Sequence, residues 1–419
     1  MRFLRQVFSY PVLVFGFFAL ILLIPDAYDA FGAALVVLSI GVIAFVRPRL
    51  FPGLDRRFAI FLALYPLSLV PSLAVKSGEW HYVDYPTRCL LFIPLIIGMR
   101  SYITSAARKY LEYAVFLGAS SGGLAAGLFS LKSLLLDHVG RVGYPLTKPI
   151  PYGQIAAFLA LISFVSLFCF GETWRRSLAA IGFLGAVYAV YASGSAGALL
   201  GLGVGFLFEV VVLLRGRLSK FQIYGLLGLC IVSTSMLMPL ASFKLGQVLS
   251  DFHAFSAGNG MGTSQGQRLL MWEMSLREIT HSPWFGIGPG HFDAVMDHFC
   301  LYHACTKEFA GFHGVHNQYL DSFMNAGIFG LLGLLVSFLG PLALFLNRAF
   351  LWVEGAPMAA TAGVAVVLAA MTSAMTQNLY GHNISVISYF FTIAFLWFMA
   401  TPPLEPVAPL PSVGDESMA

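Results

Sequence analysis

The sequence predicts an all-α polytopic membrane protein with about twelve transmembrane helices and one large, partly helical periplasmic loop. Of its 419 residues, 58% are hydrophobic and 11% are charged, whereas about 25% of the residues in a soluble domain are charged. The apolar residues form continuous runs that approach the roughly 20 residues a helix needs to cross a bilayer, and they lack the alternation of barrel strands. This composition excludes a soluble globular enzyme, a disordered protein and a disulfide-stapled secreted domain.

Twelve apolar runs are candidate spans, nine before a long polar segment and three after it. They cover residues 7–24, 31–46, 58–75, 86–99, 110–136, 150–170, 177–193, 196–214, 221–241, 319–346, 357–376 and 384–400. We therefore expect nine transmembrane helices within 1–241, a periplasmic loop that carries the site at 242–318, and three further helices within 319–400. The proline-rich residues 401–419 should form a disordered cytoplasmic tail.

Lysine and arginine residues orient the chain, because short cytoplasmic loops carry an excess of them. With the N-terminus inside, the inner loops contain fifteen Lys and Arg, and the short outer loops contain four. Both termini are therefore expected in the cytoplasm, and the long loop outside. The net charge of +4 comes from these short loops and not from a basic face, so we expect no nucleic-acid partner.

Residues 268–279 of the long loop are predicted to form an amphipathic helix. One face of this helix would carry the side chains of Leu269, Trp272, Leu276 and Ile279. Such a helix either lies on the membrane surface or packs on the outer rim of the protein without chemistry of its own.

A glycine-rich turn follows this helix. Gly286, Gly288 and Gly290 are three glycines in five residues, and their backbone amides could face an anion. The spacing is not that of a dinucleotide fingerprint, and the sequence contains no Gly-x-x-x-x-Gly-Lys-Ser/Thr motif, so we expect no nucleotide. A tight loop without a ligand is the alternative.

Seven of the ten histidines lie in the long loop. His313 and His316 precede the tenth span, but the other histidines show no arrangement that completes a zinc site, so we expect no metal. Because histidine titrates near neutral pH, His313 or His316 is the better candidate for a general base. Arg141 and Lys148, in the third outer loop, could meet an anionic head group.

Cys300 and Cys305 lie five residues apart in the long loop. In an oxidising compartment such as the periplasm they could close a small disulfide loop. Two reduced thiols are the alternative, and the sequence leaves both open.

Four short motifs, in order over about sixty residues, resemble the pattern of a known family. They are Arg268-x3-Trp272, then His281-Ser282-Pro283-x2-Gly286-Ile287-Gly288-Pro289-Gly290-x-Phe292, then His316-Asn317-Gln318-Tyr319-Leu320, and then Gly327-x2-Gly330. Together they resemble the O-antigen ligase superfamily, which includes the lipopolysaccharide O-antigen ligases and the related O-antigen polymerases.

One departure from the family pattern concerns the outer junction of the seventh and eighth runs. The family usually carries Ser-Arg-Gly there, with the Arg expected to hold the pyrophosphate of the substrate. This chain reads Ser195-Ala196-Gly197 instead. Either another cation replaces that Arg, or the chain is a natural or engineered variant with weakened activity.

The resemblance implies a metal-independent, inverting glycosyl transfer on the periplasmic side of the bacterial inner membrane. The donor would be an undecaprenyl-pyrophosphate-linked glycan, and the acceptor a sugar hydroxyl of lipid A-core. Because the diphosphate lipid is already activated, no cofactor or nucleotide would be needed.

The same resemblance implies roles for particular residues. His316 would be the base, with His313 as a helper. Because Ala196 supplies no cation, we expect Arg268 to make the main contact with the pyrophosphate, with Arg88, Arg141 or Lys148 nearby on the same outer side. The residues that position the loop would be Gly286, Gly288, Gly290 and Asn317.

Two other functions stay open. An O-antigen polymerase would use the same donor with a second lipid-linked glycan as acceptor. A transporter or flippase would use the long loop to gate a path for a lipid-linked glycan.

Overall fold

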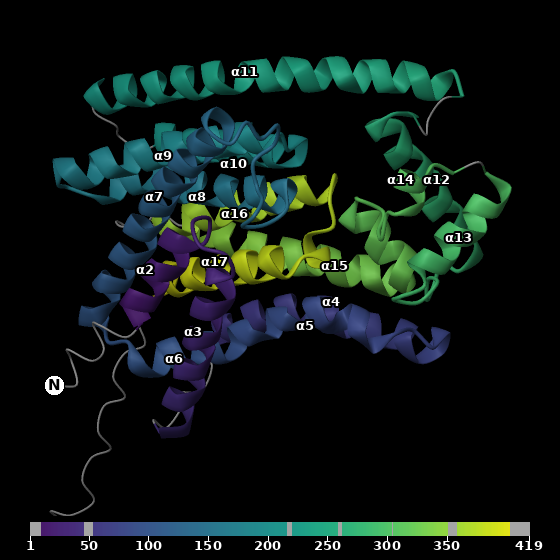
Figure 1. The fold of residues 1–419 in the computed structure, drawn as a ribbon. Coiled ribbons are helices and arrows are strands. Elements are labelled where there is room, and N and C mark those ends of the chain that lie inside the picture. The colour runs from purple at the N-terminus through teal and green to yellow at the C-terminus, as the bar shows by residue number, and fades with distance from the viewer. Residues whose placement is uncertain are drawn as a thin grey trace, which may run out of the picture.

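The computed structural model describes residues 10–45, 53–215, 220–258, 262–303, 305–350 and 358–402. Within these ranges the chain forms helices and no β-sheet (Figure 1). The helices are α2 (Tyr10–Leu20), α3 (Ala27–Phe45), α4 (Gly53–Lys76), α5 (Asp84–Arg88), α6 (Phe92–Tyr102), α7 (Ser105–Leu135), α8 (Pro149–Cys169), α9 (Thr173–Ser193), α10 (Ala196–Arg215), α11 (Lys220–Ser256), α12 (Ser264–His281), α13 (Phe292–Tyr302), α14 (Lys307–Ala310), α15 (Gln318–Phe350), α16 (Met358–Ala374) and α17 (Asn383–Ala400).

Eight of the described helices are long and apolar enough to cross a membrane: α3, α4, α7, α8, α9, α10, α15 and α17. Helices α2 and α16 are shorter apolar helices, and the predicted run 86–99 is divided between α5, a 3-10 turn and α6. The chain is thus an all-α integral membrane protein, as predicted. The number of twelve spans stays a prediction, as does the tail at 401–419, which lies outside the described ranges from residue 403 onward.

Helices α8 and α17 form the centre of the bundle. Of the most apolar window of each, 83% and 94% of the residues are buried inside the protein. A helix that is apolar on all sides suits such a position. The first residues of α8 and α17 lie on the side of the long loop. These two helices therefore hold in place the segments that precede them, residues 136–148 and 375–382.

The long loop is partly helical and has a small hydrophobic core of its own. Helices α12, α13 and α14 gather at one end of the bundle (Figure 1). Met271 and Met274 of α12 pack there with Met296 and Phe309, and Met324 of α15 joins them. Helix α11 continues to Ser256, well past the end of the predicted run at residue 241.

The amphipathic helix predicted at 268–279 is present as α12, but its buried face differs in part from the predicted one. Ile279 is buried as predicted, whereas Leu276 is 52% exposed and Met271 and Met274 are buried. The reason is that α12 packs on α15 and α11, which turns the methionine side of the helix inward. Protein packing, rather than apolar periodicity alone, therefore selects the face of α12.

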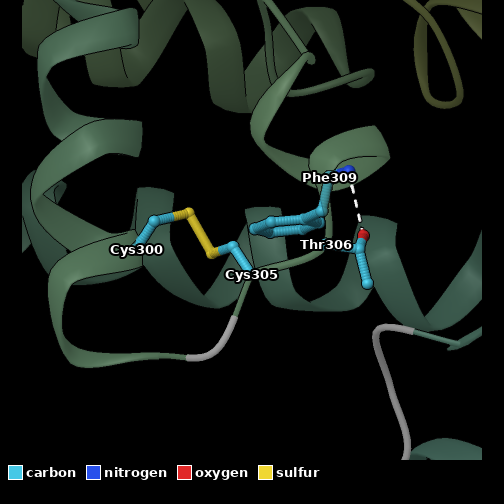
Figure 2. The surroundings of a disulfide bond; sticks show 4 residues. All are labelled: Cys300, Cys305, Thr306 and Phe309. Carbon is cyan, nitrogen blue, oxygen red and sulfur yellow. Dashed lines mark hydrogen bonds between the residues drawn. A yellow bond between two sulfur atoms is a disulfide. The ribbon is translucent and has the colours of Figure 1, made fainter.

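Cys300 and Cys305 form a disulfide, so the first of the two alternatives is correct (Figure 2). The bond joins the end of α13 to the segment before α14. There the Thr306 hydroxyl accepts a hydrogen bond from the Phe309 amide, 3.1 Å away. The disulfide and this helix cap together close the small subdomain.

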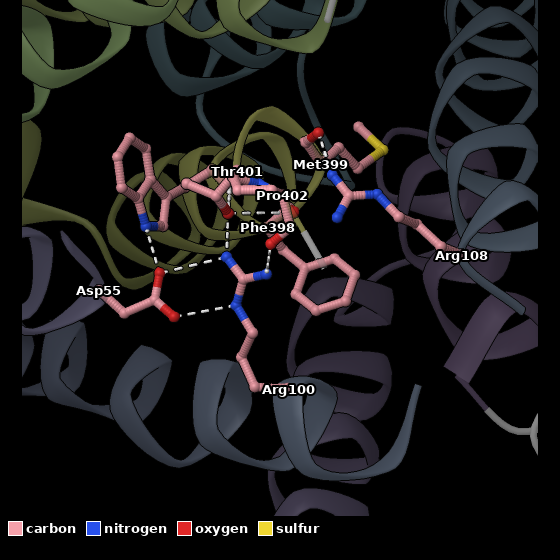
Figure 3. Close-up of polar contacts among 8 residues, drawn as sticks. Asp55, Arg100, Arg108, Phe398, Met399, Thr401 and Pro402 are labelled. Carbon is pink, nitrogen blue, oxygen red and sulfur yellow. Dashed lines mark hydrogen bonds and ion pairs between the residues drawn. The ribbon is translucent and has the colours of Figure 1, made fainter. Parts of the chain in front are cut away.

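At the opposite end of the bundle, a buried ion pair joins α4, α6 and α17. Arg100 Nε lies 2.9 Å from Asp55 Oδ2, and both side chains are almost fully buried (Figure 3). Trp397 Nε1 donates to the other carboxylate oxygen of Asp55 at 2.8 Å, and Arg100 also donates to Thr401 Oγ1. Burial makes such a pair costly to break, because removing one partner leaves an uncompensated charge.

Candidate active site

A cavity of about 560 Å³ lies at the loop end and is lined by residues of α7, α8, α9, α10, α11 and α12. Arg141 and Arg268 line it from the 136–148 segment and from α12. Ala196 lines it from the α9–α10 junction, and Asp251 from α11. We call this space the arginine cavity. It brings together residues that lie far apart in the sequence.

Arg141 reaches across to the α9–α10 junction. Its Nε donates a hydrogen bond to the carbonyl oxygen of Ser193 at 3.0 Å. Gly194 has φ +61°, and a Cβ placed there would lie 3.1 Å from Arg141 Nε. Glycine therefore serves the left-handed turn and leaves room for the guanidinium. Burial lowers the pKa of Arg141 below its ordinary value.

Arg268 is the second cation of the cavity. Burial, and then the like charge of Arg141, lower the pKa of its guanidinium. No carboxylate within the described ranges forms an ion pair with Arg141 or Arg268. Asp251 accepts a hydrogen bond from the Gln265 amide at 3.0 Å. Two neighbouring, partly desolvated arginines without carboxylate partners favour the binding of an anion.

His316 adjoins these cations. Its pKa is lowered to about 4, first by burial and then by the charges of Arg268, His382 and Lys148. The imidazole ring also packs edge-on against Phe312, with the ring centroids 5.1 Å apart. His316 is therefore neutral at physiological pH and can accept a proton.

His382 belongs to the same cluster and was missed by the sequence analysis. It precedes α17, and its pKa is lowered to about 4 by burial and by Lys148. Its only signal in the sequence is a lone histidine between two apolar runs, which does not point to any partner. Lys148, at the start of α8, had been singled out, and its charge influences both His316 and His382.

The backbone of His316 is held in the left-handed region, with φ +53°. The next residue, Asn317, directly precedes α15, and its Oδ1 accepts hydrogen bonds from the amides of Tyr319 and Leu320 at 3.0 and 3.2 Å. On the other side, Trp272 Nε1 donates to the carbonyl oxygen of Val315 at 3.2 Å. Asn317 thus caps the helix and, with Trp272, fixes the conformation of His316.

The glycine-rich turn packs into a kink of α15. Gly286, Gly288 and Gly290 all have positive φ, between 66° and 98°. The Ile287 amide donates to Met324 O at 2.8 Å, and the Gly288 amide donates to Asn325 O at 3.0 Å. These two amides are therefore used inside the protein and do not face an anion.

The kink itself lies at Gly327, whose backbone has φ +64° and ψ −157°. A Cβ at this position would lie 2.1 Å from the carbonyl oxygen of Trp284. Glycine is therefore required on conformational and on steric grounds. The kink and the turn together set the start of α15 and hence the position of His316.

Two of the predicted site residues lie elsewhere. His313 Nδ1 lies 3.1 Å from Asp293 Oδ1, and the segment between His313 and His316 is not helical. Arg88 pairs with Asp84 at 2.6 Å and does not line the arginine cavity. Arg268 and Arg141 thus line the cavity, and the charges of Arg268 and Lys148 act on His316, whereas His313 and Arg88 pair with carboxylates elsewhere.

Fold and site together define a class: a polytopic helical membrane protein with a cationic cavity and a neutral histidine at one end of its bundle. Residues 181–335 match the family model described as O-antigen ligase, which confirms the resemblance to the O-antigen ligase superfamily. The chain is also 26% identical over 392 residues to an uncharacterized protein of Haemophilus influenzae, covering 91% of this chain and 96% of that protein. The family match supports a function of the O-antigen ligase or polymerase type.

Proposed function

We propose that this protein is an O-antigen ligase, which transfers an undecaprenyl-pyrophosphate-linked glycan to a sugar hydroxyl of lipid A-core. The observation that carries the proposal is a neutral His316 beside Arg268, which lines one cavity together with Arg141. Such a site can take a proton from a hydroxyl and hold a diphosphate at the same time. His316 and Arg268 both fall within the matched segment 181–335.

In the proposed reaction His316 removes the proton from the acceptor hydroxyl. The hydroxyl oxygen then forms a bond to the anomeric carbon of the donor sugar. The bond from that carbon to the phosphate oxygen breaks, and its electron pair leaves with the diphosphate. Attack opposite the leaving group inverts the anomeric centre.

The arginines supply the second part of catalysis. Negative charge develops on the departing diphosphate, and fixed cations in a partly desolvated site stabilise it strongly. Arg268 and Arg141 are already in place before substrate binds, so little reorganisation is required. Two arginines can stabilise the negative charge of the diphosphate without a metal ion. The reaction that we propose is therefore metal-independent.

The bundle offers a path for the lipid tail of the donor. An apolar groove of about 310 Å³ lies between α7 and α9 and is lined by Leu131 and Tyr188. Leu134 and Tyr191, one helical turn further along the same helices, line the arginine cavity. The diphosphate can therefore enter the cavity while the prenyl chain stays in lipid, which avoids a cost of about 0.8 kcal/mol per exposed CH₂.

The orientation of the protein is part of the proposal. We place the loop end in the periplasm and both termini in the cytoplasm of a bacterial inner membrane. The excess of Lys and Arg in the predicted inner loops supports this orientation. The Cys300–Cys305 disulfide supports it as well, because disulfides persist in oxidising compartments.

A deletion strain tests the proposal on a single gel. Loss of a ligase leaves long glycan on the lipid carrier and none on lipid A-core. Short, unpolymerised units would indicate an O-antigen polymerase instead, and the absence of periplasmic glycan would indicate a flippase. Purified protein should also transfer glycan from the lipid-linked donor to lipid A-core without added nucleotide.

A further inference from the structure

A second, smaller cavity is lined by His313 and Gln318, which flank His316 in the sequence. Its volume is about 120 Å³, well above the ~10–15 Å³ that a single water needs. Its wall includes three aromatic and three polar side chains, those of Tyr65, Tyr82, Tyr380, Asp321, Asn325 and Asn378. We call it the tyrosine cavity.

The two cavities are lined by different residues, but some of these residues are close in the sequence. Residues 313–318 pass from His313, which lines the tyrosine cavity, through His316, which adjoins Arg268 of the arginine cavity. Thr376 lines the arginine cavity, and Asn378, two residues further on, lines the tyrosine cavity. His316 is therefore close to residues of both spaces, to Arg268 of the arginine cavity and, along the chain, to His313 and Gln318 of the tyrosine cavity.

The lining of the tyrosine cavity suits a neutral polar ligand and not a diphosphate. Its side chains include no Lys or Arg, and Asp321 contributes a carboxylate. Asn378 Nδ2 donates to Asp321 Oδ1 at 3.0 Å, so the carboxylate is held in place. A fixed carboxylate repels an anion, but it accepts hydrogen bonds from hydroxyl groups.

An unused hydrogen-bonding group also points to a ligand. The Oδ1 atom of Asn378 is buried and has no hydrogen-bond partner among the described residues. Buried polar atoms without partners are uncommon and call for an explanation, such as a ligand that completes them. Tyrosine rings beside amide and carboxylate groups offer both an apolar face and hydrogen bonds.

We propose that the tyrosine cavity binds a sugar ring of the acceptor glycan and holds its hydroxyl near His316, which lies between His313 and Gln318 of the cavity wall. This inference rests on the proposed function. The sugar would contact the ring of Tyr82 and hydrogen-bond to Asp321 and Asn378. The donor and the acceptor would then meet at His316 from two separate cavities, which suits attack opposite the leaving group.

Equilibrium binding tests the site without requiring transfer. The protein in lipid nanodiscs is titrated with lipid-free core oligosaccharide, as wild type and as Tyr82→Ala, Tyr82→Phe and Tyr85→Ala. Tyr82 and Tyr85 are matched, since they are 44% and 40% exposed, but only Tyr82 lines the cavity. We expect Tyr82→Ala to weaken binding about 2- to 10-fold, as for loss of an aromatic contact, and Tyr82→Phe and Tyr85→Ala to bind as wild type does.

Transfer assays on the same variants separate this inference from the proposed function. We expect Tyr82→Ala to raise the KM for the acceptor by a similar factor and to leave the KM for the lipid-linked donor unchanged. Absence of oligosaccharide binding to wild type, or equal binding by Tyr82→Ala and Tyr85→Ala, would overturn the inference. Absence of transfer by a wild type that binds the oligosaccharide would instead refute the proposed ligase.

Discussion

Arg141 Nε donates a hydrogen bond to the carbonyl oxygen of Ser193, 3.0 Å away, across the junction of α9 and α10. This junction is where the superfamily pattern places an arginine and where this chain has Ala196. Arg141 approaches it from a different segment, residues 136–148, and lines the same cavity as Ala196. This arrangement supports the view that Arg141 replaces the arginine of the superfamily pattern as a cation of the cavity, rather than that this position has no cation.

A rescue experiment tests the replacement of one arginine by another. We expect Arg141→Ala to reduce transfer about 10- to 100-fold, as for loss of a charge-assisted contact of roughly 1.5–3 kcal/mol. The double variant Arg141→Ala with Ala196→Arg should recover much of that loss, because it returns a cation to the same cavity. Glycan transfer by purified protein is the measurement.

Two single variants serve as controls for that rescue. Ala196→Arg alone should have little effect, since the site already contains a cation, and Arg268→Ala should be nearly inactive in either background. A large gain of activity by Ala196→Arg alone would mean that the wild-type chain is an impaired enzyme. Full activity of Arg268→Ala would place the diphosphate elsewhere.

The pH dependence of transfer should reveal the environment of His316. Burial and the charges of Arg268, His382 and Lys148 lower the pKa of His316 to about 4 in the free protein. The ring is therefore neutral and able to accept a proton above about pH 4, and it becomes protonated below that pH. We expect kcat/KM to fall on the acid side near pH 4 and not near 6.5. Lys148→Gln should move this acid limb to higher pH, because it removes a cation that disfavours protonation.

His316→Ala should abolish transfer while the amount of protein in the membrane stays normal. An acid limb at pH 6.5 in wild type, or near-normal transfer by His316→Ala, would contradict the role of this residue as the base. His313→Ala is the informative comparison, since His313 pairs with Asp293 and lies apart from the arginines. We expect it to retain most of the activity.

The kink of α15 should tolerate no side chain. Gly327→Ala introduces a Cβ about 2.1 Å from Trp284 O, in a backbone region that costs of order 1–3 kcal/mol for other residues. We expect a lower melting temperature in detergent and loss of transfer. Gly203→Ala in α10 is the matched control, because a Cβ there meets nothing within 4 Å and alanine favours a helix by about 1 kcal/mol.

The disulfide gives a test of sidedness and of loop stability. In intact cells without reductant, we expect no maleimide labelling of Cys300 or Cys305, and labelling by an impermeant maleimide after reduction. The Cys300→Ser and Cys305→Ser double variant should lower the stability of the α13–α14 region by about 2 kcal/mol, which is typical for a short loop. Hydrogen exchange measures that change. Labelling of unreduced wild type would contradict the bond.

The groove between α7 and α9 should matter for long donors only. Leu128 lines it and is 58% exposed, so Leu128→Trp fills the groove without crowding the core. We expect slower transfer from an undecaprenyl-linked donor and unchanged transfer from a short-prenyl donor. Leu200→Trp is the control, since Leu200 is 55% exposed and lies outside the groove. Equal effects of the two variants would show that the lipid tail of the donor does not bind in the groove.

Much of the fold could be predicted from the sequence, because in lipid the length and hydrophobicity of a segment nearly determine that it is a helix. The predicted runs correspond to helices, and the motifs around Arg268 and His316 lie within the segment that matches the family model. Helix ends are set by packing as well as by composition, so the extension of α11 to Ser256 and the division of the run at 86–99 could not be predicted in this way.

The face of α12 and the membership of the site were decided by the tertiary structure. Apolar spacing indicated Leu276, but packing on α15 buries Met271 and Met274 instead. His382 lies sixty-six positions from His316 in the sequence, and only the approach of α17 to α15 makes their charges interact. Sequence spacing reports neighbours within one helix and not contacts between the ends of distant helices.

The sequence by itself determined that the chain is a helical membrane protein that resembles the O-antigen ligase superfamily, a resemblance that the family model over residues 181–335 confirms. Hydrophobic runs and short motifs are local properties of the sequence, so they can be recognised without knowledge of the fold. The tertiary structure alone decided that Arg141 occupies the place beside Ala196 and that Arg88 and His313 lie apart. Bringing charges together at one cavity requires the packing of α7, α9 and α12, and that packing depends on contacts between residues far apart in the chain.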